Sequence, residues 1–247
     1  MARQSSFIKL EGTIGDVTFY KGANGSFARQ KGGVSKSRIM NDPKFQRTRE
    51  NLAEFARAAA ASQLLKNAFR EIILRSKDLR THNRLYALAM KVLKTDLINP
   101  RGERAFEEGD MSLVKGFQFN ANAMWNSTVF AQYTAQDAAS EINVEFETFV
   151  PGSKIASPLG ATHARIFLVT ASLNVPDGIF ETNVVTSTEL ILDHQPLSGL
   201  TLQIDKIAGG ATLKAYALGI EFLQLVNGTM YGLNNNAHNA AVIFKVE

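Results

Sequence analysis

The hydrophobic pattern of the chain changes its period near residues 99–110, and this change constrains the fold more than any other feature. Before this segment, apolar residues recur three and four positions apart, as in Leu85, Leu88 and Val92. After it, apolar and polar residues alternate, most clearly over residues 141–149. A period of about 3.6 is typical of helices and a period of about two is typical of strands, so we expect a helical part followed by an all-β part.

Two helices are expected before the change of pattern. Asn41 and Asp42 are good helix-capping residues, and Pro43 suits the first helical position because its missing N–H would be unpaired there anyway. We expect one helix over residues 43–75, with Ser62 as the candidate position for a division. A second helix is expected over residues 79–97, where a stripe of apolar residues ends before a proline.

Residues 7–31 predict a small antiparallel element. Short stretches that contain Phe19 and Phe27 flank Asn24-Gly25, which is a strong hairpin signal because both residues accept a positive φ. Two or three short strands are only marginally stable alone. We therefore expect this element to pack on the helices or on another subunit.

Eight candidate strands follow the change of pattern, and turn residues such as Pro176-Asp177-Gly178 separate them. The candidate strands cover residues 113–119, 127–132, 141–149, 163–175, 184–192, 200–207, 212–226 and 240–246. Short strands without intervening helices are typical of a sandwich. We predict an α+β fold in which an N-terminal β-hairpin and helices precede a C-terminal Ig-like antiparallel β-sandwich, with a closed antiparallel sheet as the alternative for the second part.

Charge divides the chain at nearly the same place as the hydrophobic pattern. Residues 1–104 contain 21 Lys and Arg against 9 Asp and Glu, whereas residues 105–247 contain 6 against 14. The formal balances are +12 and −8, within a net charge of +4. We expect a basic N-terminal hairpin plus helical domain over residues 1–104 and a β-sandwich domain over residues 105–247, with different surface roles.

No catalytic or metal-binding pattern is evident. The chain has no cysteine, and its histidines lack the spacing that places two ligands on one helix face. The histidines are His82, His163, His194 and His238. Glu145 and Glu147 alternate with apolar residues, as on a solvated strand face, rather than forming a recognisable catalytic pair. We expect no enzymatic activity, no metal, no cofactor and no small-molecule substrate.

Neither a signal peptide nor a membrane span is expected. The first ten residues lack a continuous apolar core, and no run of about 18 apolar residues occurs in the chain. We expect a protein that stays in the cytoplasm of the cell that makes it, or leaves that cell as part of an assembly.

The basic residues beside the small β element suggest two main functions. The first is a structural subunit that self-assembles into a homo-oligomer or filament, with its basic N-terminal half docked on the β-domain of a neighbouring copy. The second is nucleic-acid binding by the basic 29–57 region. For both functions the expected basic contacts are Arg29, Lys31, Lys36, Arg38, Arg47 and Arg49. The expected apolar assembly contacts are Phe7, Ile8, Phe19 and Phe27.

A third hypothesis is a carbohydrate- or protein-binding module on the loops of the β-domain. Its candidate aromatic residues are scattered along the sequence, at Trp125, Tyr133, Tyr216 and Tyr231. Gly12–Gly15 also matches the short G-x-x-G loop of some RNA-binding domains, but its flanks predict strands instead of the two helices that such a loop joins.

Several segments resemble an uncharacterised bacterial protein family of similar length. They are Ile8–Lys21, which contains G-T-I-G-D-V-T-F-Y-K, then Asn41–Pro43, Gln46–Asn51 and Ala217–Phe222. The family has no assigned activity, so the resemblance implies a shared domain layout and no functional residue. An N-terminal arm before a β-sandwich is also similar in architecture to virion and filament subunits, an analogy of layout alone.

Overall fold

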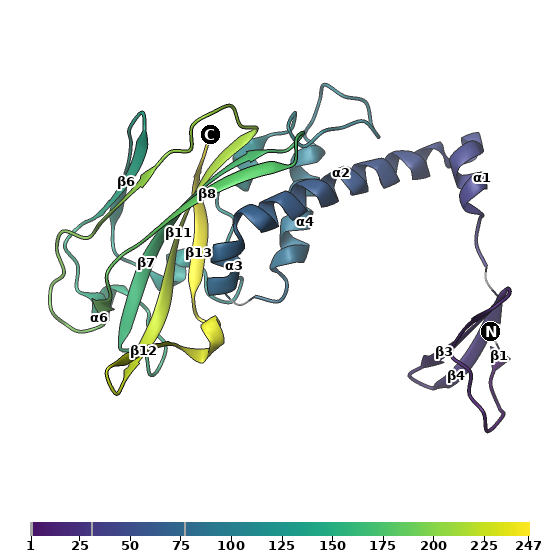
Figure 1. Ribbon diagram of the computed structural model, residues 1–247, viewed down its shortest axis with the longest axis horizontal. Coiled ribbons are helices and arrows are strands. Elements are labelled where there is room, and N and C mark those ends of the chain that lie inside the picture. The colour runs from purple at the N-terminus through teal and green to yellow at the C-terminus, as the bar shows by residue number, and fades with distance from the viewer. Residues whose placement is uncertain (1, 31, 77) are drawn as a thin grey trace. The chain divides into compact units, whose positions relative to one another are not determined.

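The computed structural model describes residues 2–30, 32–76 and 78–247, and it shows an α+β fold with helices and antiparallel sheets (Figure 1). This confirms the predicted fold class at that level. Contacts divide the chain into two compact units, Met1–Arg49 and Glu50–Glu247. The boundary predicted between residues 104 and 105 therefore lies inside the second unit, where helices and strands share a core.

The first unit contains a four-stranded antiparallel sheet of order β1-β4-β3-β2. The strands are β1 (Ala2–Arg3), β2 (Gly12–Ile14), β3 (Val17–Gly22) and β4 (Gly25–Gln30). β3 and β4 form the predicted hairpin, but Gly22 pairs with Gly25, so the two-residue connection is Ala23-Asn24. Gly25 has a φ of 125°, a conformation that glycine adopts without steric cost.

A short helix, α1 (Lys36–Asn41), follows the sheet in a stretch for which no helix was predicted. Its first turn is capped by the hydroxyl of Ser35, which accepts a hydrogen bond from the Arg38 N–H. The turn of 3-10 helix η1 (Pro43–Phe45) comes next, with Asp42 as its capping residue. The predicted use of Asp42 and Pro43 at a helix start is therefore present in the structure.

The long helix predicted over residues 43–75 is divided. α2 (Gln46–Ala68) and α3 (Arg70–Arg75) are separated at Phe69, whose backbone leaves the helical region, and not at Ser62. Phe69 is completely buried, so packing of its ring accompanies the break. α4 (Thr81–Leu93) occupies the middle of the second predicted helix.

The second unit has two antiparallel sheets. One contains three strands in the order β10-β6-β5, and the other has the path β12-β11-β7-β8, with β13 paired to β11 and β9 paired to β7. The strands are β5 (Tyr133–Asp137), β6 (Glu141–Phe146), β7 (His163–Asn174), β8 (Ile179–Thr186), β9 (Leu190–Ile191), β10 (Thr201–Asp205), β11 (Leu213–Val226), β12 (Thr229–Gly232) and β13 (Ala240–Val246). The remaining short helices are η2 (Met111–Val114), α5 (Trp125–Thr128), α6 (Pro151–Lys154) and η3 (Asn234–Asn236).

Two predicted strands, residues 113–119 and 127–132, were wrong. The first region contains η2, which the Asp110 side chain caps, and the second contains the end of α5. Their apolar residues are nevertheless buried, as Phe119 shows by packing its ring 5.2 Å from that of Phe69. Apolar side chains in irregular segments complete the core here without forming strands.

The six-stranded sheet is covered on both faces. Side chains such as Phe167 and Val169 on β7 join the core formed with α2, α3 and α4. Their neighbours Ile166 and Leu168 point the other way and join the core formed with the three-stranded sheet. Burial on both faces explains why β7 and β11 read as nearly continuous apolar runs. Residues of both sheets form the second of these cores, and helices supply the other layer of the first.

Two polar clusters hold irregular parts of the second unit in place. Lys206, which follows β10, lies 2.5 Å from the Asp137 carboxylate and 3.1 Å from the Glu247 carboxylate, and Lys245 is paired with the same two acids. This cluster connects β5, the end of β10 and the end of β13. Asp96 is almost completely buried after α4, where its carboxylate accepts hydrogen bonds from three backbone N–H groups.

Candidate functional site

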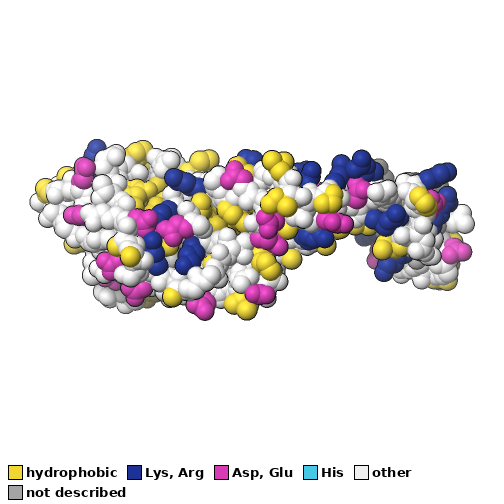
Figure 2. Space-filling view, turned by 90° about the horizontal axis from the view of Figure 1, so that it is seen from above, with side chains coloured by type: hydrophobic (Ala, Val, Ile, Leu, Met, Phe, Trp, Pro, Cys, Tyr) yellow, Lys and Arg dark blue, Asp and Glu magenta, His cyan; other side chains and the backbone are white. Residues whose placement is uncertain are grey.

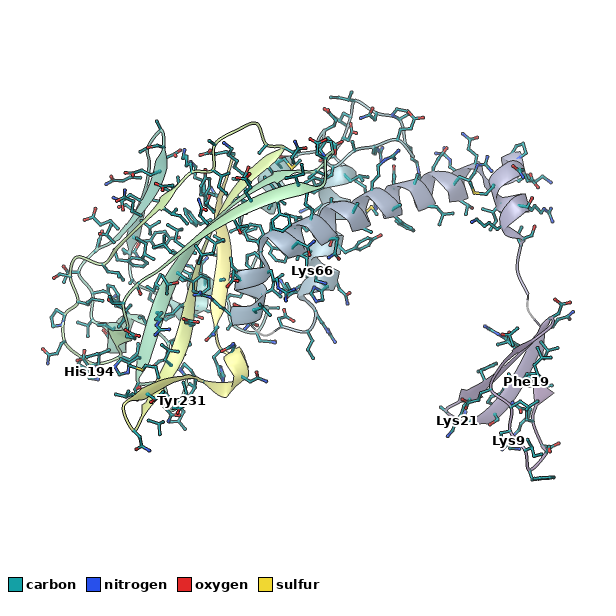
Figure 3. The ribbon with its side chains drawn as sticks, viewed as in Figure 1. Lys9, Phe19, Lys21, Lys66, His194 and Tyr231 are labelled. Atoms are coloured by element: carbon teal, nitrogen blue, oxygen red, sulfur yellow. The ribbon has the colours of Figure 1, made fainter. Side chains whose placement is uncertain are left out.

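The N-terminal sheet has one largely apolar face, on which Lys21 is the only Lys or Arg of the described strands. Residues that pair directly across antiparallel strands share a face, so the register places five apolar side chains together. They are Ala2, Ile14, Val17, Phe19 and Ala28, with Ile14 opposite Val17, and with Phe19 and Ala2 each opposite Ala28. In Figure 3 Phe19 and Lys21 are labelled on this sheet, and Lys9 is labelled in the loop between β1 and β2.

The opposite face of the same sheet is aromatic and cationic. Tyr20 and Phe27 are paired across β3 and β4, and their rings stack with centroids 5.9 Å apart. The guanidinium of Arg29 lies 5.4 Å from the Tyr20 ring centroid, a cation–π distance. Arg3 on β1 pairs with Phe27 and adds a second guanidinium to this face.

Neither face is covered in the first unit. None of the described residues in 2–30 and 32–49 is buried, and Phe19, Tyr20 and Phe27 are only partly exposed. In the loop between β1 and β2, Phe7 is 94% exposed and Ile8 is 58% exposed. A sheet normally buries at least one face against another layer, so this unit has contact surfaces that its own fold leaves open.

The structure separates the four predicted apolar contacts. Phe19 lies on the apolar face and Phe27 on the aromatic and cationic face, whereas Phe7 and Ile8 lie in the exposed loop. The hairpin spacing already contained this information. Whichever two residues between 22 and 26 form the connection, each odd-numbered residue of one strand pairs with an even-numbered residue of the other. Paired residues share a face, so Phe19 and Phe27, which are both odd-numbered, lie on opposite faces.

Two of the predicted basic contacts are engaged within the first unit. Arg49 donates hydrogen bonds to the carbonyl oxygens of Ile39 (2.7 Å) and Asp42 (2.9 Å), which satisfies acceptors at the end of α1. Arg38 lies 3.3 Å from the Asp42 carboxylate. Sequence reasoning did not foresee these structural roles, which follow from the formation of α1.

The other predicted cations lie on different elements. Arg29 is on β4 and Lys36 begins α1, while Arg47 is exposed in the first turn of α2. Lys31 lies outside the described residues. Figure 2 shows several Lys and Arg side chains gathered on the surface of the first unit. The structure thus spreads the predicted basic contacts over one sheet face and two helices.

The three-stranded sheet of the second unit has an acidic outward face. Ile142, Val144 and Phe146 point inward and are buried, as the alternation predicted. The register places the following side chains on the outward face: Thr134, Gln136, Glu141, Asn143, Glu145, Thr201, Gln203 and Asp205. None of these eight positions carries a Lys or Arg.

A depression of about 740 Å³ in the second unit surrounds a structural carboxylate. Asp78 accepts hydrogen bonds from the Arg84 guanidinium (2.6 Å) and from the N–H groups of Arg80 (2.8 Å) and Ala121 (3.1 Å). Burial raises the pKa of Asp78, but these hydrogen bonds outweigh it and the net pKa is lowered. The carboxylate is therefore held ionised as a hydrogen-bond acceptor for the 78–84 and 118–121 backbone.

The four candidate aromatic residues of the carbohydrate hypothesis do not form a platform. Trp125 is 2% exposed and Tyr216 is 0% exposed, so their rings are core residues. Tyr133 is half-buried, with its ring centroid 6.2 Å from that of Trp125, and Tyr231 is exposed on β12 (Figure 3). Burial raises the pKa of the Tyr133 hydroxyl, and a hydrogen bond with Trp125 partly opposes this.

Within residues 2–30, 32–76 and 78–247, no group of three or more His, Asp or Glu side chains is arranged to hold a metal ion. Across the same residues, no helix combines the length and the apolar character that a bilayer crossing requires.

Comparisons with known proteins assign neither a family nor a function to the chain. No protein-family model matches the chain, and no significant match was found among curated proteins or solved structures.

Proposed function

We propose that the chain is a non-enzymatic structural subunit that self-assembles into a homo-oligomer or filament, as virion subunits do. The observation that carries the proposal is the N-terminal sheet, whose two faces are both uncovered in its own unit. Apolar side chains in a sheet contribute to stability only when water is excluded from them. A partner that covers this sheet would therefore stabilise both the sheet and the assembly.

Charge favours another copy of the same chain as that partner. The described residues of 2–49 contain nine Lys and Arg against three Asp and Glu, whereas residues 105–247 carry a balance of −8. Surfaces of opposite charge attract over about 8 Å at physiological salt. Contact between two different surfaces of one chain is heterologous, so it closes into a ring or continues as a filament.

In this proposal the two sheets of the second unit form an Ig-like sandwich that serves as the body of the subunit, while the first unit serves as the docking arm. The subunit needs no cofactor, no metal and no small-molecule substrate. It remains in the cytoplasm of its cell or leaves as part of the assembled particle.

The proposal is tested on the full-length protein by light scattering coupled to size-exclusion chromatography, with negative-stain microscopy of the eluted peak. We expect rings or filaments of uniform width at low salt. Phe19→Glu places a charge on the apolar face and is expected to prevent assembly, whereas Ala23→Glu, in the exposed hairpin connection, is the matched control and is expected to assemble. A monodisperse monomer at both low and moderate salt would refute the proposal.

The alternative function is nucleic-acid binding by the 29–57 region. The excess of Lys and Arg in the first unit favours it, and Lys36 and Lys44 are both exposed there. A mobility-shift titration against DNA and RNA at increasing salt separates the two functions. Binding that weakens steeply with salt would support this alternative, and no binding at low salt would exclude it.

A further inference from the structure

We infer that the outward face of the three-stranded sheet β10-β6-β5 is the surface on which the aromatic and cationic face of the N-terminal sheet of a second copy docks. This inference rests on the proposed self-assembly and identifies the two contacting surfaces. The docking face is defined as the eight outward residues given above, Thr134 to Asp205. The docking arm face is defined as Arg3, Tyr20, Phe27 and Arg29.

The docking face carries carboxylates that the fold leaves uncompensated. In the described part of the chain, Glu145 and Asp205 make no side-chain hydrogen bond or ion pair, and both are exposed. Glu141 differs, because Gln203 beside it donates a hydrogen bond to its carboxylate. Some acids elsewhere in the unit are paired, as Glu189 is with Arg165. A face with unpaired acids and no base attracts a cationic partner.

The arm face has the matching chemistry. Arg3 and Arg29 each present a planar guanidinium, which binds a carboxylate through two parallel hydrogen bonds better than lysine does. Tyr20 and Phe27 lie on the same face and provide a flat, largely apolar area for the Thr and Gln side chains of the docking face. Tyr and Arg are the residue types that most often dominate binding energy at protein interfaces.

The other face of the arm does not fit the same surface. Placing Val17 and Phe19 over Glu145 and Asp205 would remove those carboxylates from water, and Lys21 at the end of β3 is the one cation that the described strands place on this face. Such desolvation is strongly unfavourable. The choice between the two faces of the arm therefore follows from charge, and the apolar face, which Phe19→Glu alters, is left for a second contact within the same assembly.

The size of the contact indicates how it would behave. Three strands of about five residues cover a footprint of about 17 Å by 14 Å, or about 240 Å². A stable interface between two proteins buries about 800 Å² per partner. One docking contact is therefore weak and sensitive to salt, and it becomes effective when many copies repeat it.

A charge-exchange experiment on the full-length protein tests the pairing. One variant carries Arg3→Glu and Arg29→Glu, and the other carries Glu145→Lys and Asp205→Lys. Each variant alone is expected to associate about tenfold or more weakly than the wild type, because attraction across the contact becomes repulsion. An equimolar mixture is expected to assemble again, since the acidic arm of one variant meets the basic face of the other. The quadruple variant in one chain is expected to assemble by itself.

The control variant is Asp177→Lys with Glu181→Lys, which reverses two exposed acids at the turn before β8 and on β8, outside the docking face. It should assemble as the wild type does. Circular dichroism of every variant verifies that these exposed substitutions leave the fold intact. Analytical ultracentrifugation at several salt concentrations measures the association.

The outcomes separate this inference from the proposed function. If the wild-type protein stays monomeric, both the proposed self-assembly and the docking face are refuted. The docking face is refuted, and self-assembly is not, if the wild-type protein assembles and neither charge reversal weakens its association. The same conclusion follows if the mixture and the quadruple variant both fail to assemble. Weakening by the control variant to the same extent would show a general charge effect and would also overturn the specific pairing.

Discussion

The ring of Phe167 on β7 lies directly over Gly219 on β11, so that a Cβ atom at Gly219 would be 2.1 Å from the ring. The two residues pair across the centre of the six-stranded sheet, on the side that faces the helices. The guanidinium of Arg75 lies over the same ring, 4.9 Å from its centroid. The absence of a side chain at Gly219 is therefore what gives the ring its place in the core.

Gly219→Ala is expected to lower the free energy of unfolding by about 1–3 kcal/mol, because the added methyl forces the Phe167 ring or the strand to move. Urea unfolding followed by circular dichroism measures the change. Gly210→Ala is the control, since a Cβ there would meet open space. Equal stability of the Gly219 and Gly210 variants would contradict the packing argument.

The Lys206 cluster predicts how stability depends on alkaline pH. The hydrogen bond that Lys206 donates to Asp137 is the largest cause that raises the pKa of Lys206 to about 12, and burial raises the pKa of Tyr216 to about 12. Each group holds its proton more tightly in the folded state. Their contributions are complete below about pH 10 and are lost as pH rises toward 12. Lys206→Met should flatten this loss in thermal unfolding measured between pH 8 and pH 11.

In acid, the same cluster makes the stability of the fold decrease as the pH falls. Hydrogen bonds from Lys206 and Lys245 lower the pKa of Asp137, and they outweigh burial in lowering the pKa of Glu247. The stabilisation is present above the ordinary carboxyl pKa values and is lost as pH falls through the lowered ones. Asp137→Asn should reduce the stability gained between pH 3 and pH 6, and an unchanged acid profile would contradict the pairing.

Asp96 is expected to fix the loop that follows α4. Burial raises the pKa of its carboxyl, but hydrogen bonds from Ala105, Asn99 and Ile98 outweigh it and lower the pKa strongly. Asp96→Ala should therefore destabilise the second unit and speed amide exchange at Ala105, whose N–H lies 2.9 Å from the carboxylate. Hydrogen-exchange mass spectrometry detects this. Asn99→Ala, which removes one donor to Asp96, should have a smaller effect at the same amide.

Arg49 is expected to stabilise α1 through the two carbonyl groups that it binds. Arg49→Met should increase amide exchange within Lys36–Asn41, because Ile39 and Asp42 lose their guanidinium donors. Lys44→Met removes an exposed charge nearby and is the control. Exchange in α1 that is the same for both variants would show that Arg49 acts only through its charge.

The sequence predicted the elements whose local pattern agrees with their packing. β6 was found because one of its faces is buried and the other is solvated, which produces strict alternation. Residues 113–119 misled the prediction because Val114 and Phe119 are buried from an irregular segment, and burial alone does not distinguish a strand from a loop that covers the core. α1 was missed because six residues contain too little periodicity.

The candidate site was predictable in its residue types but not in its arrangement. Phe19 and Phe27 were both identified, yet the division between them depends on the strand register. The engagement of Arg49 by α1 could not be predicted before the helix itself was known. The acidic docking face depends on β5 and β10 lying on either side of β6, a neighbour relationship between segments far apart in the chain.

The double burial of β7 and β11 has a consequence for how the protein is made. The helices α2, α3 and α4 form their core with strands that lie much later in the sequence, including β11 and β13. During synthesis on the ribosome the apolar sides of those helices emerge first and have no native partner until the last strands appear. The second unit therefore completes its fold late, and chaperones that shield apolar helices would act on it in that interval.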